Sequence, residues 1–136
     1  MSSSRPATPE DVDRIATTLP EVEFGTSWGD RPTYLVRGRG FLLYRAPHHS
    51  AGDPDSGEMY DDLLVITTPT EADKRALVAE ERLPFFTIDH FDGYHAVLVQ
   101  QSRLGEIDVG ELEEVITDAW AARAPKTLAR KHLGGR

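Results

Sequence analysis

Apolar residues in the first twenty positions recur at the spacing of one helical face. Val12, Ile15, Ala16 and Leu19 stand at i, i+3, i+4 and i+7, a pattern that predicts an amphipathic helix. Signals for both ends of this helix surround the stripe: a capping residue, a first-turn proline, a capping-box acid and a terminating proline. These residues are Thr8, Pro9, Asp11 and Pro20.

Strand-like runs separated by glycine-containing turns follow this helix. Gly38-Arg39-Gly40 lies between two runs of β-forming residues, which predicts a β-hairpin with its tip at these three residues. Asp92-Gly93 lies between two further runs and predicts a second hairpin. Residues 63–67 are apolar almost throughout, which is typical of a strand buried inside its sheet. The predicted strands cover residues 24–28, 33–37, 41–45, 63–67, 85–88 and 96–100.

Two longer helices and a short basic one complete the pattern. Thr70 begins a helix that reaches residue 80, and Asp108 begins a helix that Pro125 ends; each start has an acid at the capping-box position. Residues 126–133 predict a short basic helix. Because the strands come in hairpin-linked runs and do not alternate with helices, we expect an α+β fold. This is a two-layer sandwich, an antiparallel sheet of about five or six strands with helices packed on one face. The length suits a single domain, 1–136.

Composition restricts the chemistry that this chain can perform. It contains no cysteine, which excludes a disulfide framework, a thiolate nucleophile and zinc held by cysteines. No apolar run approaches the roughly 18–20 residues that span a bilayer, and the polar start of the chain lacks the apolar core of a signal peptide. We therefore expect a cytoplasmic protein that does not enter the membrane.

Charge is spread unevenly along the chain. The 15 Lys and Arg against 23 Asp and Glu give a formal net charge of −8, and a field of this sign repels polyphosphates. Residues 123–136 nevertheless hold five cations and no acid. Nucleic-acid contacts are therefore expected only at this segment and at an arginine-bearing hairpin tip, although cations also suit any helix C-terminus. The candidate nucleic-acid-binding residues are Arg37, Arg39, Arg123, Lys126, Arg130 and Lys131.

Three other patterns bear on chemistry. His90, Asp92 and His95 gather around the second predicted hairpin tip, where a metal or acid–base site is the alternative to polar capping of the turn. The acidic stretch 47–62 lacks the spacing of an EF-hand calcium loop. Ser27 lacks the glycine spacing of a hydrolase nucleophile elbow. We expect no catalytic residue, no metal site and no cofactor, and hence a protein that is not an enzyme.

Three segments occur in order along nearly the whole chain. They are Ala7-Thr8-Pro9-Glu10-Asp11-Val12 running into Leu19-Pro20-Glu21-Val22 and Gly25-Thr26-Ser27-Trp28-Gly29, then Phe86-Thr87-Ile88-Asp89-His90-Phe91-Asp92-Gly93-Tyr94 followed by Val97-Leu98-Val99, then Ala119-Trp120-Ala121-Ala122-Arg123-Ala124-Pro125-Lys126 ending in Leu128-Ala129. Together these segments resemble the MmcQ/YjbR family. The resemblance implies a frataxin-like α+β sandwich with one helical layer on an antiparallel sheet. It also implies DNA binding of the double-wing type, and it brings no enzyme chemistry.

Two functions stay open at this point. We predict a non-enzymatic binding domain of the MmcQ/YjbR type that contacts DNA of unknown target through its local basic patch. The alternative is a small-ligand or protein-interaction module with no nucleic-acid role, which the net charge of −8 favours. Strand aromatics such as Tyr34 and Tyr44 suit either base stacking or an ordinary core. Nothing in the sequence decides the oligomeric state, for which a monomer is the simpler expectation.

Overall fold

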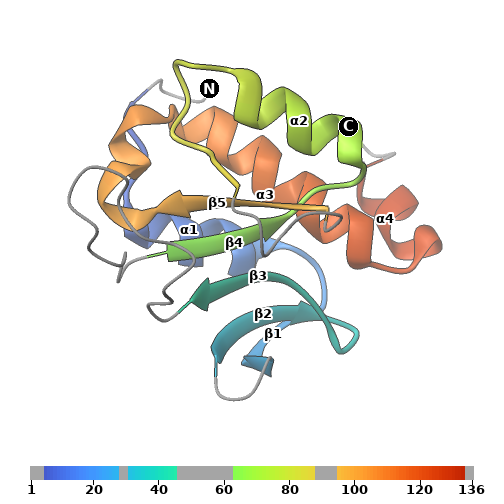
Figure 1. Cartoon of the computed structure of the whole chain (residues 1–136). Helices are drawn as coiled ribbons and strands as arrows, with labels where there is room; N and C mark the ends of the chain where they lie inside the picture. Colours follow the sequence, from blue (N-terminus) through green and yellow to red (C-terminus); the bar gives the residue numbers. More distant parts are fainter. Residues whose placement is uncertain (1–4, 28–30, 46–62, 88–94, 134–136) are drawn as a thin grey trace.

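An antiparallel five-stranded sheet with helices packed on one face organises the protein (Figure 1). The structure is a computed structural model that describes residues 5–27, 31–45, 63–87 and 95–133. The strands lie side by side in the order of the sequence, and the predicted α+β fold is confirmed. Their bounds are β1 Val22–Ser27, β2 Arg31–Val36, β3 Arg39–Arg45, β4 Leu63–Thr67 and β5 Ala96–Gln100.

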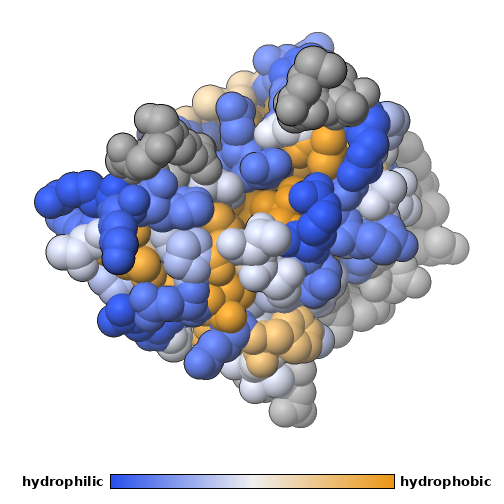
Figure 2. All heavy atoms as spheres, turned by 180° about the vertical axis from the view of Figure 1, so that it is seen from behind, coloured by the Kyte–Doolittle hydropathy of each residue, from blue (hydrophilic) through white to orange (hydrophobic). Residues whose placement is uncertain are grey.

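Along the chain, α1 precedes the strands, α2 lies between β4 and β5, and the remaining helices follow β5. Figure 1 shows α1 and α3 behind the strands and α4 beside the end of α3. Viewed from that side, hydrophilic side chains cover most of the surface, and hydrophobic atoms show in a band between them (Figure 2). None of the described helices is long and apolar enough to cross a membrane. Their bounds are α1 Pro9–Thr18, α2 Glu71–Ala79, a 3-10 helix η3 Gln101–Glu106, α3 Val109–Arg123 and α4 Lys126–Leu133.

The main core lies between the helices and the sheet. Trp120 of α3 is fully buried, and its indole Nε1 donates to the carbonyl oxygen of Pro20 at 3.0 Å. This bond ties α3 to the loop that leads from α1 into β1. Burying a large apolar side chain stabilises a fold by roughly 1.5–3 kcal/mol, so this layer accounts for most of the apolar stabilisation. Its largest fully buried members are Trp120, Phe41, Leu42, Leu64, Ile66, Leu104, Ile107, Leu112 and Ile116.

A smaller apolar cluster lies on the opposite face of the sheet. Leu43, Val65 and Leu98 pair across β3, β4 and β5 and are buried there, with Phe86 packed against them. Successive side chains of a strand point to opposite faces, so β4 contributes to both clusters. This explains why every residue of β4 is buried, as its apolar run predicts.

The β2–β3 turn differs from the prediction. Val36 pairs with Arg39, so Arg37 and Gly38 form a two-residue turn and Arg39 begins β3. Both turn residues have positive φ, 51° and 80°, which is the type I′ conformation that matches the twist of a hairpin. Tyr34 then pairs with Leu42 and Leu35 with Gly40, which leaves Phe41 as an extra, bulged residue. A tip at residues 38–40 was therefore wrong, because the tighter turn and the bulge together set the register.

The second predicted hairpin is present only in part. Phe86 forms an isolated bridge with Leu98, with both backbone bonds at 2.8–2.9 Å, and no longer strand is described at residues 85–88. The predicted tip at Asp92-Gly93 lies outside the described residues. The bridge still closes part of the outer edge of β5.

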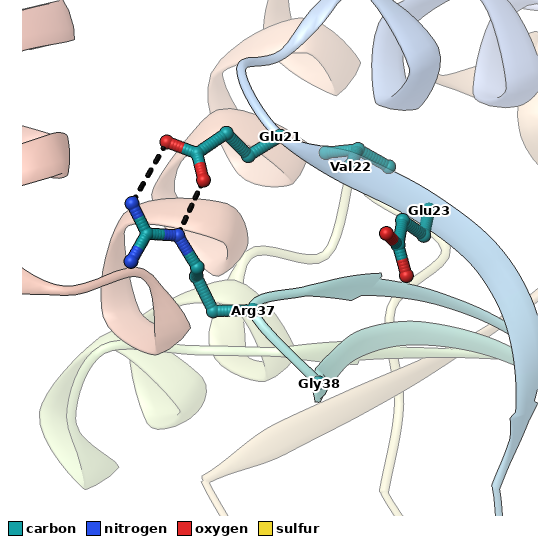
Figure 3. A pocket seen from close by; sticks show the side chains of 5 residues that line it. All are labelled: Glu21, Val22, Glu23, Arg37 and Gly38. Atoms are coloured by element: carbon teal, nitrogen blue, oxygen red, sulfur yellow. Dashed lines mark hydrogen bonds and ion pairs between the residues drawn. The ribbon is translucent and has the colours of Figure 1, made fainter.

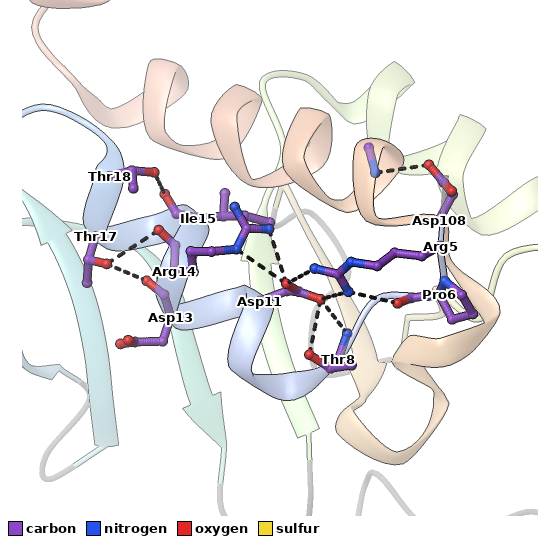
Figure 4. Close-up of polar contacts among 11 residues, drawn as sticks. Arg5, Pro6, Thr8, Asp11, Asp13, Arg14, Ile15, Thr17, Thr18 and Asp108 are labelled. Carbon is purple, nitrogen blue, oxygen red and sulfur yellow. Dashed lines mark hydrogen bonds and ion pairs between the residues drawn. The ribbon is translucent and has the colours of Figure 1, made fainter. Parts of the chain in front are cut away.

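A buried carboxylate organises the start of α1 (Figure 4). Asp11 accepts hydrogen bonds from the backbone N–H and hydroxyl of Thr8 at 2.9 and 3.0 Å, and from the guanidinium of Arg5 at 2.7 and 2.8 Å. Arg14 donates to the same carboxylate at 3.1 and 3.3 Å. These bonds, that of Arg5 first, hold the pKa of Asp11 well below its usual range. The predicted capping acid therefore also anchors the N-terminal segment.

Candidate nucleic-acid interface

The predicted basic residues come from two separate parts of the chain that lie at the same end of the molecule. Figure 1 shows the β2–β3 turn and α4 at the same end. The ring of His132 on α4 packs edge-on against Trp120, 5.1 Å between centroids, and Trp120 is bonded to Pro20, next to Glu21. We call the six candidate cations at this end the basic end: Arg37, Arg39, Arg123, Lys126, Arg130 and Lys131.

Helix α4 presents one cationic face because its other face is used for packing. Leu128, Ala129 and His132 are half-buried against the core and α3. Lys126 and Arg130 are exposed, and residues four apart lie on one helical face. Lys131 is exposed beside them. The predicted helix is thus amphipathic, with its cations accessible to an anion.

Arg37 is held by an acid that no sequence pattern singled out. Its guanidinium donates to both carboxylate oxygens of Glu21, from Nε to Oε1 and from Nη2 to Oε2, the latter at 3.0 Å. This bonding, together with the positive charges of Arg37 and Lys131, lowers the pKa of Glu21, and the pKa of Arg37 is raised in turn. Both side chains are about half exposed. The hairpin arginine therefore meets solvent already paired with a carboxylate.

The backbone at this pair is unusual. Glu21 and Arg37 are the two non-glycine residues with positive φ in the described part of the chain, 57° and 51°. Left-handed φ is unfavourable for residues with a side chain, and such positions persist only where surrounding contacts impose them. An Asn or Gly would suit the turn better than Arg37. The ion pair between Glu21 and Arg37 could be recognised only from the folded structure, because the two residues come from different loops.

An open hollow of about 620 Å³ adjoins the pair, lined by Glu21, Val22, Glu23, Arg37 and Gly38. Figure 3 shows Glu21 and Arg37 pointing toward each other from the loop just before β1 and from the β2–β3 turn, with Glu23 near the start of β1. A Cβ placed on Gly38 would meet nothing within 4 Å. Solvent and small anions therefore have direct access to this pair.

The remaining two candidates differ in exposure. Arg39 is exposed at the start of β3. Arg123, in the last turn of α3, is half-buried, and its Nε is buried without a hydrogen-bond partner in the described part of the structure. Because Arg123 is less accessible than Arg39, we expect less contact with a ligand from it.

One aromatic side chain stands out on the sheet. Phe24 on β1 is 61% exposed, the one large hydrophobic side chain so exposed among the described residues. Its ring lies 5.0 Å from that of buried Tyr34, whose hydroxyl donates to Asp13 at 2.6 Å. Of the strand aromatics considered for base stacking, Tyr34 is buried in the core and Tyr44 is half-buried against it.

The other candidate chemistry receives little support from the described residues. His95 is exposed, whereas His90, Asp92 and the acidic stretch 47–62 lie outside the described part. Within the described ranges, no group of three or more His, Asp or Glu side chains is arranged to hold a metal ion. The hypothesis of no catalytic residue stays a prediction.

Comparison with known proteins places the chain in a family. The family model YjbR matches residues 17–122. The chain is 38% identical over 136 residues to Uncharacterized protein Mb2600 of Mycobacterium bovis and to Uncharacterized protein Rv2570 of Mycobacterium tuberculosis (strain H37Rv), matches that cover 93% of this chain and 96% of each relative. No solved structure gives a significant match. The chain belongs to the YjbR family.

Proposed function

We propose that this protein is a non-enzymatic nucleic-acid-binding domain that uses the basic end. The observation that carries the proposal is that the β2–β3 turn and α4 lie at the same end of the molecule (Figure 1), so that cations from residues 37–39 and 126–131 lie at one end of an acidic molecule. Phosphate contacts from Arg and Lys supply most of non-specific nucleic-acid affinity. The family membership supports the same function, since the sequence pattern of this family implies DNA binding.

The rest of the molecule limits how nucleic acid can approach. The formal net charge of −8 repels phosphates from most directions. A bound strand is therefore expected to touch only the basic end, with a small number of phosphate contacts and modest affinity. Each neutralised phosphate contributes about 0.9 to the slope of log affinity against log salt for duplex DNA, and about 0.7 for single strands.

The test is fluorescence anisotropy with mixed-sequence DNA and RNA at several salt concentrations. Lys126→Gln with Arg130→Gln should weaken binding and reduce the salt slope by about one for each phosphate that is no longer neutralised. Arg103→Gln is the matched control, because η3 and α4 lie at opposite ends of α3, whose 15 residues span about 22 Å. No binding by the unaltered protein at low salt and tens of micromolar concentration would refute the proposal.

A second function, as a protein-interaction module, is supported by Phe24. This exposed ring lies on β1, an edge strand of the sheet, and edge strands can pair with an added strand. A partner that binds there would lose affinity with Phe24→Ser and keep it with Lys126→Gln. Loss of affinity with Lys126→Gln but not with Phe24→Ser would show that the partner binds at the basic end.

A further inference from the structure

We propose that Glu21 acts as an internal anion that occupies a phosphate site at the guanidinium of Arg37, and that an incoming phosphate group must displace it. This proposal rests on the proposed function for its ligand, the phosphate group of a nucleic acid. The site itself is defined by the described residues alone.

Geometry makes Glu21 a competitor for a phosphate. A guanidinium presents parallel N–H donors that match either a carboxylate or a phosphate, and the Nε and Nη2 donors of Arg37 are both engaged by Glu21. The carboxylate of Glu21 thus already occupies the donors that Arg37 would offer to a phosphate. The positive charge of Lys131 adds to the lowering of the pKa of Glu21.

The backbone supports a role beyond turn formation. Both partners hold positive φ, although glycine or asparagine would form these turns with less strain. Glu21 and Arg37 nevertheless occupy these positions, and their half-exposed side chains form an ion pair beside an open hollow. An exposed ion pair contributes little to stability, so folding alone does not account for the arrangement.

The open hollow beside the Glu21–Arg37 ion pair allows an external anion to reach Arg37 and replace the carboxylate. The hollow is open beside Gly38, where nothing lies within 4 Å of an added Cβ. Glu23 lines the same hollow and, among the described residues, forms no ion pair. Glu23 is therefore a matched control for Glu21, because it carries the same charge beside the same hollow but forms no ion pair within the described part of the chain.

The experiment compares Glu21→Gln with Glu23→Gln in the full chain, with inorganic phosphate and a short DNA strand as probes. NMR of the arginine Nε–H groups follows Arg37 directly. Glu21→Gln should bind both probes roughly five- to tenfold more tightly, as expected for loss of a like charge at ion-pair distance in high dielectric. Glu23→Gln should change affinity less than about twofold, because its more distant charge is screened.

Two further variants keep the test decisive. Glu21→Gly relieves the positive φ and removes the carboxylate, so it should reproduce the gain even if Glu21→Gln is poorly folded. Adding Arg37→Gln to Glu21→Gln should abolish the gain. Equal phosphate binding by Glu21→Gln, Glu23→Gln and the unaltered protein would overturn the proposal, whether or not DNA binds. A gain for phosphate without any DNA binding would support the site and refute nucleic acid as its ligand.

Discussion

Replacing Asp11 by asparagine should destabilise the protein measurably. Asparagine keeps one oxygen that can accept from Thr8 but loses the carboxylate that accepts from Arg5 and Arg14. The Asp11 side chain is 5% exposed, whereas those of Arg5 and Arg14 are 46% and 51% exposed. Both arginines can therefore return to water, and the full penalty of about 3–5 kcal/mol for an orphaned buried charge does not apply.

The expected loss for Asp11→Asn is about 2 kcal/mol. Hydrogen bonds to a charged group contribute about 1.5–3 kcal/mol net, and the helix cap contributes about 1 kcal/mol, part of which asparagine retains. Asp11→Ala should lose about 3 kcal/mol because it also removes the cap. Urea unfolding followed by circular dichroism measures both values, and Glu113→Gln, an exposed acid on α3, should differ from the unaltered protein by less than about 0.5 kcal/mol.

The pH dependence gives an independent check. Because the folded pKa of Asp11 is lowered by its hydrogen bonds, that of Arg5 first, its ionised form stabilises the fold above the unfolded pKa of about 3.9. This stability is lost as pH falls toward the folded pKa. The difference between the unaltered protein and Asp11→Asn should therefore be constant from pH 5 to 7 and shrink below pH 4. A difference under about 0.5 kcal/mol at pH 7, or one that does not shrink in acid, would refute the reasoning.

Three other substitutions test separate parts of the fold. Trp120→Phe should cost about 2–3 kcal/mol in urea unfolding, because it loses the donor to Pro20 and part of a fully buried ring; an unchanged midpoint would contradict this packing. Gly38→Ala should cost about 1 kcal/mol from its positive φ alone, since its surroundings are open. Tyr34→Phe should cost about 1 kcal/mol by removing the bond to Asp13. Burial, followed by that bond, raises the pKa of Tyr34, so the 295 nm absorbance of the two proteins should agree up to pH 11.

Signals within a few residues predicted most elements because their causes are local. The stripe from Val12 to Leu19 and the cap at Thr8 placed α1 almost to the residue, and the apolar run of β4 predicted its burial on both faces. The turn at Arg37 and Gly38 was missed, since glycine at either 38 or 40 permits a turn. The choice between them depends on pairing with β2 and on the Phe41 bulge, which involve residues distant in sequence.

The order of residues along the chain establishes which charges are available: five cations without an acid in residues 123–136, arginines near the first hairpin, and an acidic remainder. What each charge does follows from the packing of the elements. The fold pairs Arg37 with Glu21, half-buries Arg123 at the end of α3, and leaves Lys126, Arg130 and Lys131 exposed. An ion pair depends on the distance between side chains from separate elements. For Glu21 and Arg37 the pairing of β1 with β2, which sets Val22 opposite Val36, brings the two residues together.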